Sequence, residues 1–299
     1  MITLKVGWIG NYRRAGKRFD IAFRVCKEFG HELSIAGGPD TSLYLPRSEM
    51  ASWIRKQDVI LSTSVFEAHP LIMYESLACG VPFVIERHVG DGFINNVRGV
   101  AYYQDFNIKS INDALNYIEE NHSHMSLEAV KEIHENWLWS KIKPQYDYMF
   151  TKFSGKDNPH VTFLIDSPGW AWDHMMKEIK EYVWENTDII YMAEKDWDWI
   201  NSKPFEETDI VINLQLHDRR LAIIDDDGKD EPCIPIEKHI LSINGPAFVN
   251  QKHSGRFAYH VRNCSAITTV SKDIARYLNF LEKPLYYATR GVDIKKFHP

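Results

Sequence analysis

The sequence of 299 residues has few cysteines, no excess of basic charge and no long apolar run. Its cysteines, at positions 26, 79, 233 and 264, form no C-x-x-C pair and no metal-ligand spacing, so they predict reduced thiols in a reducing compartment. The net charge of −6 argues against a general nucleic-acid binder. No stretch is long enough to span a bilayer, and no signal sequence opens the chain. These absences predict a cytoplasmic protein without a transmembrane segment.

Short apolar runs alternate with amphipathic stretches along the whole chain, a pattern typical of parallel α/β sheets. The first half predicts strands at LKVGWIG, HELSIAGG, DVILSTS and PFVIE, and the alternation restarts at HVTFLID. It also predicts a helix over KRFDIAFRVCKEFG that ends at Gly30, and helices at 109–120 and 126–139. Between the halves lies the polar stretch SGKDNP, which is a linker candidate. We therefore expect two Rossmann-like domains, at residues 1–153 and 159–299. The resemblance described below implies that these domains face a cleft.

The segment SVFEAHPLIMYESLACGVPFV, which begins at Ser64, carries the sharpest functional signal. It follows the apolar strand DVILST and leads into a helix with Pro70 near its first turn, where proline fits. Glu67 precedes this helix and Glu75 lies within it, so both carboxylates can face the carboxyl end of the sheet, where open α/β folds bind ligands. A carboxylate accepts two hydrogen bonds and suits the vicinal hydroxyls of a sugar. Two glutamates at this spacing also occur by chance on solvated helices, so the full string is the more specific signal.

This segment resembles the S-x-x-E-G-x-P-L-x-x-x-E-A-x-A-C-G-x-P-V-V block of the family 4 retaining glycosyltransferases, which have the two-domain GT-B fold. The resemblance implies that Glu67 contacts the donor sugar and that Glu75 holds the donor ribose. The other donor-binding positions that it implies in this segment are Ser64, His69, Pro70 and Leu71. The sequence has Ala68 where the family usually has glycine, and Ser76 where it has alanine.

The opening KVGWIGNYRRAGKRFDIAF resembles the family's first strand, glycine turn and helix, with Gly10 at the turn. Lys17 matches the lysine that neutralises the donor diphosphate. A glycine turn, a helix N-terminus and nearby cations also form a phosphate cradle on physical grounds. The family's partner arginine would fall at Asn11, so Arg13 or Arg14 is the candidate substitute; a solvated basic loop is the alternative.

The second half resembles the acceptor domain of the same enzymes, through NCSAITTVSKDIARYL and the terminal ATRGVDIKKFHP. Gly169 lies where the family's glycine-rich loop approaches the donor phosphates. Asp173 and His174 begin the next helix, where they serve either the acceptor or the helix cap. Asn244 occupies a position where the family often has histidine, which leaves any role for a protonatable group there in doubt.

The order of the two resemblances is the reverse of the family's, because the donor half comes first and the chain ends on the interdomain linker. We therefore expect a circular permutation. It predicts that Met1 and Pro299 lie close together and that residues near 140–158 form a second crossing between the domains.

The resulting hypothesis is a retaining, metal-independent glycosyltransferase that moves a sugar from a nucleotide-diphosphate sugar to an undetermined acceptor without a cofactor. Catalysis is assigned to Glu67 and Lys17, with Asp173 and His174 as candidates on the acceptor side. One alternative is a GT-A enzyme that binds a metal through the acidic run 225–227. Others are a non-catalytic GT-B module that binds a nucleotide or a partner, and a sugar-nucleotide epimerase, which fits the glutamates less well.

Overall fold

The computed structural model describes residues 3–37, 42–65, 67, 70–90, 97–169, 171–196, 198–199, 202, 204–214, 222–224, 230–232, 234–243, 255–270 and 272–299. The chain divides into two compact units. The first comprises Met1–Lys141 together with Gly291–Pro299, and the second comprises Ile142–Arg290.

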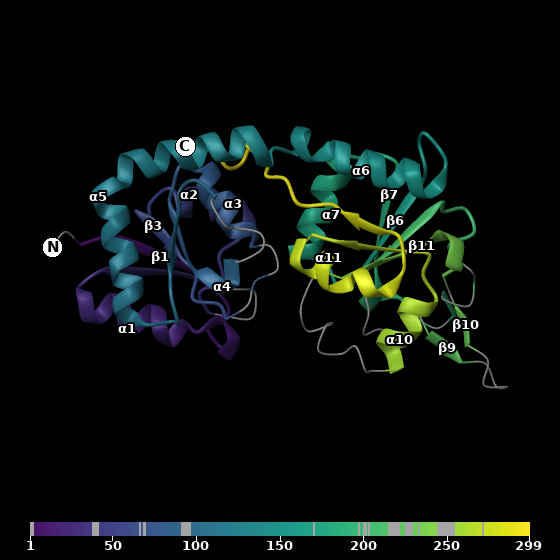
Figure 1. The fold of residues 1–299 in the computed structure, drawn as a ribbon, viewed down its shortest axis with the longest axis horizontal. Helices are drawn as coiled ribbons and strands as arrows, with labels where there is room; N and C mark the ends of the chain where they lie inside the picture. The colour runs from purple at the N-terminus through teal and green to yellow at the C-terminus, as the bar shows by residue number, and fades with distance from the viewer. Residues whose placement is uncertain are drawn as a thin grey trace. The chain divides into compact units, whose positions relative to one another are not determined.

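The first unit contains a parallel five-stranded sheet in the order β2-β1-β3-β4-β5 (Figure 1). Its strands are β1 (Lys5–Gly10), β2 (Glu32–Gly37), β3 (Val59–Leu61), β4 (Phe83–Glu86) and β5 (Val100–Tyr103). Its helices are η1 (Ala15–Lys17), α1 (Phe19–Phe29), α2 (Arg47–Ile54), α3 (Leu71–Ala78), α4 (Arg87–Gly90), α5 (Ile108–Glu132) and the π-helical turn η2 (Ile133–Trp137). All these strands have nearly continuous or alternating apolar sequence, as expected for a sheet covered on both faces.

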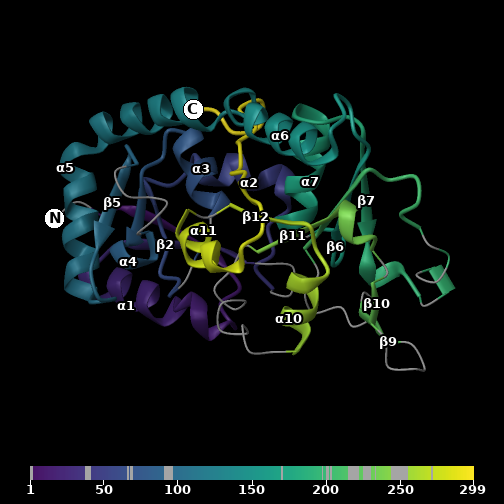
Figure 2. The ribbon, with the colours of Figure 1, turned by 45° about the vertical axis from the view of Figure 1, so that its right-hand side comes forward.

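Successive side chains along each strand point to opposite faces of the sheet, so the core of this unit consists of two layers. Val59 and Leu61 pack with α1 and the first half of α5, whereas Ile60 packs with α2 and α3. Helix α5 contributes to both layers because it continues past the edge strand β5 (Figure 2). The sequence predicts two helices here, at 109–120 and 126–139; the structure has one, because nothing between them breaks a helix.

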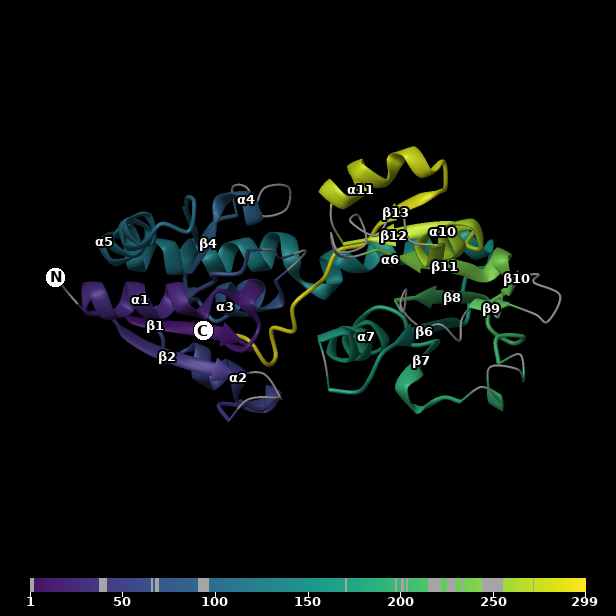
Figure 3. The same cartoon turned by 90° about the horizontal axis from the view of Figure 1, so that it is seen from below.

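The second unit contains a parallel six-stranded sheet in the order β13-β12-β11-β8-β6-β7, which Figure 3 shows from end to end. The strands are β6 (Val161–Ile165), β7 (Thr187–Tyr191), β8 (Ile210–Asn213), β11 (His239–Ser242), β12 (Ala266–Thr269) and β13 (Leu285–Tyr287). The other elements within the described residues of this unit are α6 (Trp139–Ser154), α7 (Ala171–Tyr182), η3 (Met192–Glu194), the antiparallel pair β9 (Ala222–Ile224) and β10 (Asp230–Pro232), η5 (Ile236–Lys238), α10 (Gly255–Arg262), α11 (Lys272–Leu278) and η6 (Asn279–Leu281).

The predicted α/β class with two Rossmann-like parallel sheets is confirmed. The unit limits differ from the expected 1–153 and 159–299, because most of α6 belongs to the second unit. There the Tyr146 hydroxyl donates a hydrogen bond to the carbonyl of Thr289 (3.0 Å), next to the end of β13. The chain passes between the units at 141–142, within the predicted crossing 140–158, and returns at 290–291.

The last nine residues, 291–299, pack on the first unit rather than on the second. Val292 N–H donates to the carbonyl of Trp137 (2.9 Å), and Phe297 is buried in the layer formed by α2 and α3. Pro299 lies against Gly80, at the turn that leads into β4. Met1 lies outside the described residues, so its expected proximity to Pro299 stays a prediction.

Among the described residues, no helix combines the length and the apolar character that crossing a membrane requires.

Candidate functional site

The strand order of the first unit defines a topological switch point between β1 and β3. The chain leaves β1 toward β2 on one side and later returns to place β3 on the other. In doubly wound sheets of this order, ligands bind outside the carboxyl ends of the strands at such a point. The residues that follow β1 and β3 are 11–18 and 62–67, which include Lys17, Ser64 and Glu67 among the predicted positions.

The structure brings Lys17 and Glu67 together at this switch point. The Lys17 ammonium group forms an ion pair with the Glu67 carboxylate, and both side chains are partly exposed. The backbone carbonyl of Lys17 accepts a hydrogen bond from Thr63 Oγ1 (2.8 Å), and Thr63 Oγ1 accepts one from Trp8 Nε1 (2.9 Å). These bonds fix the turn after β1 to the end of β3, so the ion pair is positioned by buried side chains that the sequence did not single out.

The turn between β1 and α1 carries the other predicted cations. Asn11 orders it, because its side-chain oxygen accepts a hydrogen bond from Arg13 N–H (3.0 Å) and its carbonyl accepts one from Arg14 N–H (3.0 Å). Arg13 and Arg14 are exposed, and the guanidinium of Arg13 lies over the ring of Tyr12. Position 11 thus holds a turn-forming residue, and the positive charge lies two and three residues later.

A site that we name the Lys17–Glu67 site therefore lies at the carboxyl ends of β1 and β3. It consists of Gly10, Asn11, Arg13, Arg14, Lys17, Ser64 and Glu67. Val65 N–H donates to the carbonyl of Gly16 (2.9 Å), which holds the two segments side by side. Pro70 and Leu71 begin α3 at the same edge of the sheet, and His69 lies outside the described residues. The site combines positive charge, backbone N–H groups at the start of α1 and one carboxylate, which suits a phosphorylated ligand.

Glu75, the expected ribose ligand, is buried in an ion pair. Its side chain is on α3, is 3% exposed and pairs with the guanidinium of Arg47 at the start of α2. The same guanidinium lies 4.8 Å from the centre of the Phe297 ring. Sequence reasoning missed Arg47. In this arrangement Glu75 links α3 to α2 and to the terminal segment.

In the second unit, Asp173 is 1% exposed and both of its carboxylate oxygens are occupied. Oδ2 accepts hydrogen bonds from Gly169 N–H and Lys177 Nζ (both 2.8 Å), and Oδ1 accepts one from the Tyr191 hydroxyl (2.7 Å). Burial alone would raise the pKa of Asp173, but these three donors outweigh it and lower the pKa. Asp173 therefore orders the loop at Gly169 and the start of α7.

The remaining positions predicted in this unit are less informative. His174 follows Asp173 on α7 and is half-buried. Asn244 and the acidic run 225–227 lie outside the described residues. The GT-A alternative, which depends on that run, stays a hypothesis.

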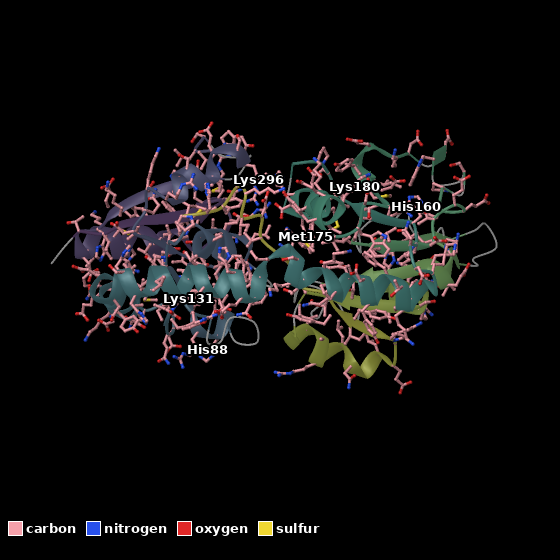
Figure 4. The ribbon with its side chains drawn as sticks, turned by 90° about the horizontal axis from the view of Figure 1, so that it is seen from above. His88, Lys131, His160, Met175, Lys180 and Lys296 are labelled. Atoms are coloured by element: carbon pink, nitrogen blue, oxygen red, sulfur yellow. The ribbon has the colours of Figure 1, made fainter. Side chains whose placement is uncertain are left out.

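Each unit also has a hollow that the sequence did not predict. In the second unit a small, mainly apolar cavity of about 20 Å³ lies between the sheet and helices α6 and α7. Met175, labelled in Figure 4, lines it, and Ser242 and Thr268 contribute hydroxyl groups. In the first unit a polar groove of about 420 Å³ follows the edge strand β5 and α5, and its lining includes Arg87, Tyr102 and Asp113.

The described cysteines are buried free thiols. Burial raises the pKa of Cys26 to about 12 and that of Cys79 and Cys264 to about 11, so none of these three presents a reactive thiolate at neutral pH.

No protein-family model matches the sequence, and no curated protein matches it either. Among solved structures, the chain aligns with a sugar ABC transporter protein from Actinomyces odontolyticus at 9% identity and a TM-score of 0.26, over 87% of this chain and 75% of that one. It also aligns with a carbohydrate transporter solute binding protein from Agrobacterium radiobacter in complex with D-arabinose, at 9% identity and a TM-score of 0.26, over 96% and 93%. A third is a chorismate mutase/shikimate 5-dehydrogenase fusion protein from Clostridium acetobutylicum, at 10% identity and a TM-score of 0.25, over 95% and 85%. TM-scores this low support no functional conclusion.

Proposed function

We propose that this protein is a glycosyltransferase that takes its sugar from a nucleotide-diphosphate donor bound at the Lys17–Glu67 site. The observation that carries the proposal is the ion pair between Lys17 and Glu67 at the β1/β3 switch point. A lysine for the diphosphate and a glutamate for the sugar are thereby adjacent, as the resemblance to family 4 glycosyltransferases implies. The GT-B arrangement and its circular permutation are part of this proposal.

In the proposed reaction, the bond between the anomeric carbon and the diphosphate oxygen breaks while an acceptor oxygen bonds to that carbon. The acceptor's proton leaves with the diphosphate. Lys17, Arg13 or Arg14 and the backbone N–H groups at the start of α1 stabilise the charge that develops on the leaving group. Glu67 exchanges its contact with Lys17 for the sugar hydroxyls. Retention of configuration follows from the family resemblance, and the second unit is proposed to carry the acceptor.

A second candidate is a GT-B module that binds a nucleotide without turning it over. The observation in its favour is that Glu75 and Asp173, two of the expected functional acids, are buried and paired with Arg47 and Lys177. Release of free sugar from a nucleotide-sugar by the purified protein would count against this candidate.

The test is a thermal-shift screen of UDP-, GDP-, ADP-, CMP- and dTDP-sugars against the full chain. A ligand at 100 times its Kd adds about 2.7 kcal/mol to the free energy of unfolding, which raises the melting temperature visibly. The shift from the binding donor should be lost in Lys17→Ala. It should persist in Lys27→Ala, which removes an exposed lysine from the far end of α1. A shift that is the same in both variants would overturn the assignment of the site.

A further inference from the structure

A second group of chemically active side chains lies at the carboxyl ends of β4 and β5, in the first unit. Glu86 is the last residue of β4, His88 is on α4 directly after it, and Asp105 follows the end of β5. Because β4 and β5 are paired in parallel, with Glu86 opposite Tyr103, these strand ends are neighbours. One nitrogen or oxygen atom from each of the three side chains lies within 4.8 Å of the others.

Glu86 is the unusual member of this group. It is 2% exposed, and one of its oxygens, Oε2, accepts a hydrogen bond from Val89 N–H (2.8 Å). Within the part of the chain that the structure describes, its other carboxylate oxygen has no hydrogen-bond or ion-pair partner. A buried carboxylate is costly unless it is paired, coordinates a metal or is neutralised.

Four other buried carboxylates of this protein show the usual solution. Glu75, Glu132, Asp173 and Asp293 are each paired with an arginine or lysine, namely Arg47, Arg98, Lys177 and Lys296. No described lysine or arginine forms an ion pair with Glu86. The groups next to it are instead an imidazole and a second carboxylate, which are metal ligands rather than counter-ions.

We propose that Glu86, His88 and Asp105 bind a divalent transition-metal cation, with Zn²⁺ and Mn²⁺ as the best-matched ions. One imidazole nitrogen and two carboxylate oxygens are typical of such ions, whereas Mg²⁺ and Ca²⁺ prefer oxygen ligands alone. The cation supplies the positive charge that the buried Glu86 lacks.

The geometry allows the site to close around an ion. Ligand atoms about 2.0–2.2 Å from a metal lie roughly 3–4 Å from one another, so the three groups need to approach by about an ångström. Glu86 is buried, while His88 and Asp105 are exposed side chains; Figure 4 shows His88 at the surface of the first unit. Asp105 and Phe106 have positive φ values of 57° and 50°. This left-handed conformation is energetically costly for residues other than glycine, and it sets the course of the backbone after β5.

Three protein ligands leave at least one coordination position open. Structural zinc sites are closed by four protein ligands, whereas sites with three keep a position for water or substrate. The inferred site lies at the carboxyl ends of the strands, where sheets of this kind bind ligands, and two of its three residues are exposed. It is therefore suited to hold an oxygen-bearing ligand through the metal. The sequence did not indicate it, because its ligands come from two different strand ends.

The test is isothermal titration of the metal-stripped full chain with ZnCl₂ and MnCl₂, followed by dialysis and metal analysis. One ion per chain is expected, with affinity at least about tenfold weaker in His88→Ala and in Asp105→Asn. The matched control His124→Ala, which removes an exposed histidine from α5, should bind like the parent. Circular dichroism establishes that each variant is folded.

Glu86→Gln tests the buried ligand separately, because it removes the charge and keeps the shape. It should weaken binding as well, and it should lose the increase in melting temperature that Zn²⁺ gives the parent. Equal binding by the parent, His88→Ala and Asp105→Asn would overturn the proposal, and so would the absence of binding to the parent.

Discussion

The guanidinium of Arg47 lies between the carboxylate of Glu75, with which it forms an ion pair, and the ring of Phe297, above which it stacks. One side chain at the start of α2 thus joins α3 to the terminal segment 291–299. Glu75 is buried while Arg47 is about a quarter exposed, so the pair stabilises the first unit only while both partners are present.

Arg47→Met should therefore destabilise the protein by about 3 kcal/mol, because it leaves the Glu75 carboxylate buried without its cation. Methionine keeps most of the contact with Phe297. The double variant Arg47→Met/Glu75→Met should recover much of this loss, since replacing both charges by apolar groups is often neutral. Urea unfolding of the parent, the two single variants and the double variant gives the coupling energy. Additive effects would show that the pair contributes nothing.

Gly99, before β5, tests how closely α5 approaches the sheet. A Cβ atom built at Gly99 would lie 2.5 Å from the Cβ of Ala129, and the residue has a φ of +80°. Gly155 is the matched control, because it has a φ of +70° and nothing within 4 Å of such an atom. Gly99→Ala should therefore cost about 1–3 kcal/mol more than Gly155→Ala. Equal losses in unfolding experiments would place the whole effect in the backbone conformation.

His239 predicts a pH dependence of stability in the second unit. Burial lowers its pKa from 6.5 to about 4, although Nδ1 lies within hydrogen-bond distance of the carbonyl of Asn263 (2.6 Å); nearby His260 and Lys283 lower the pKa further. The unfolded chain therefore binds this proton more readily between pH 6.5 and pH 4. The free energy of unfolding should fall as pH falls through that window, by up to about 1.4 kcal/mol per pH unit.

The measurement is the urea midpoint of the parent and of His239→Gln at pH 7, 6 and 5. The variant should lose stability at pH 7 and show a flatter pH profile. His160→Gln is the matched control, because it removes a partly exposed histidine from the same unit and leaves the buried His239 in place. A steep profile that persists in His239→Gln would assign the dependence to other groups, His260 first.

The sequence was sufficient to predict most strands of the sheets, because these strands are apolar and the segments between them contain residues that mark where helices and turns begin and end. The predicted strands PFVIE and HVTFLID match β4 and β6, and the helix predicted to end at Gly30 does so, with a left-handed φ of 77°. Strand β5 was missed because VAYY is short and alternates weakly. The assignment of 291–299 was also missed, because the burial of Phe297 depends on tertiary packing that periodicity does not encode.

The candidate site was predictable only in part, for a related reason. Lys17 and Glu67 were singled out because each lies in a recognisable motif. They are close in the structure because the strands that precede them, β1 and β3, are paired. Arg47 and Thr63 have no motif, and their roles come from partners distant in sequence. The group at Glu86 is invisible for the same reason, since it depends on the pairing of β4 with β5.

If the proposed function is correct, sugar transfer should persist in EDTA. Lys17 and the arginines of the β1–α1 turn are expected to neutralise the diphosphate, and the inferred metal site at Glu86 is not assigned to the transfer step. The measurement is transfer activity before and after removal of metal, with the metal content determined in parallel. Activity that is lost with the metal and restored by Mn²⁺ would favour a metal-dependent mechanism instead.

The final prediction separates Glu67 from Lys17. Glu67→Gln keeps the shape of the side chain but cannot form the ion pair, so it should lower transfer at least about 100-fold while the donor still binds. Lys17→Ala should instead weaken donor binding, because it removes the cation from the diphosphate. Transfer kinetics and isothermal titration with the donor found in the screen distinguish the two effects. Glu32→Gln is the control, because Glu32 is exposed at the opposite end of the sheet, where β2 begins. If Glu67→Gln transfers sugar like Glu32→Gln, the Glu67 carboxylate does not take part in transfer and the assignment of this site fails.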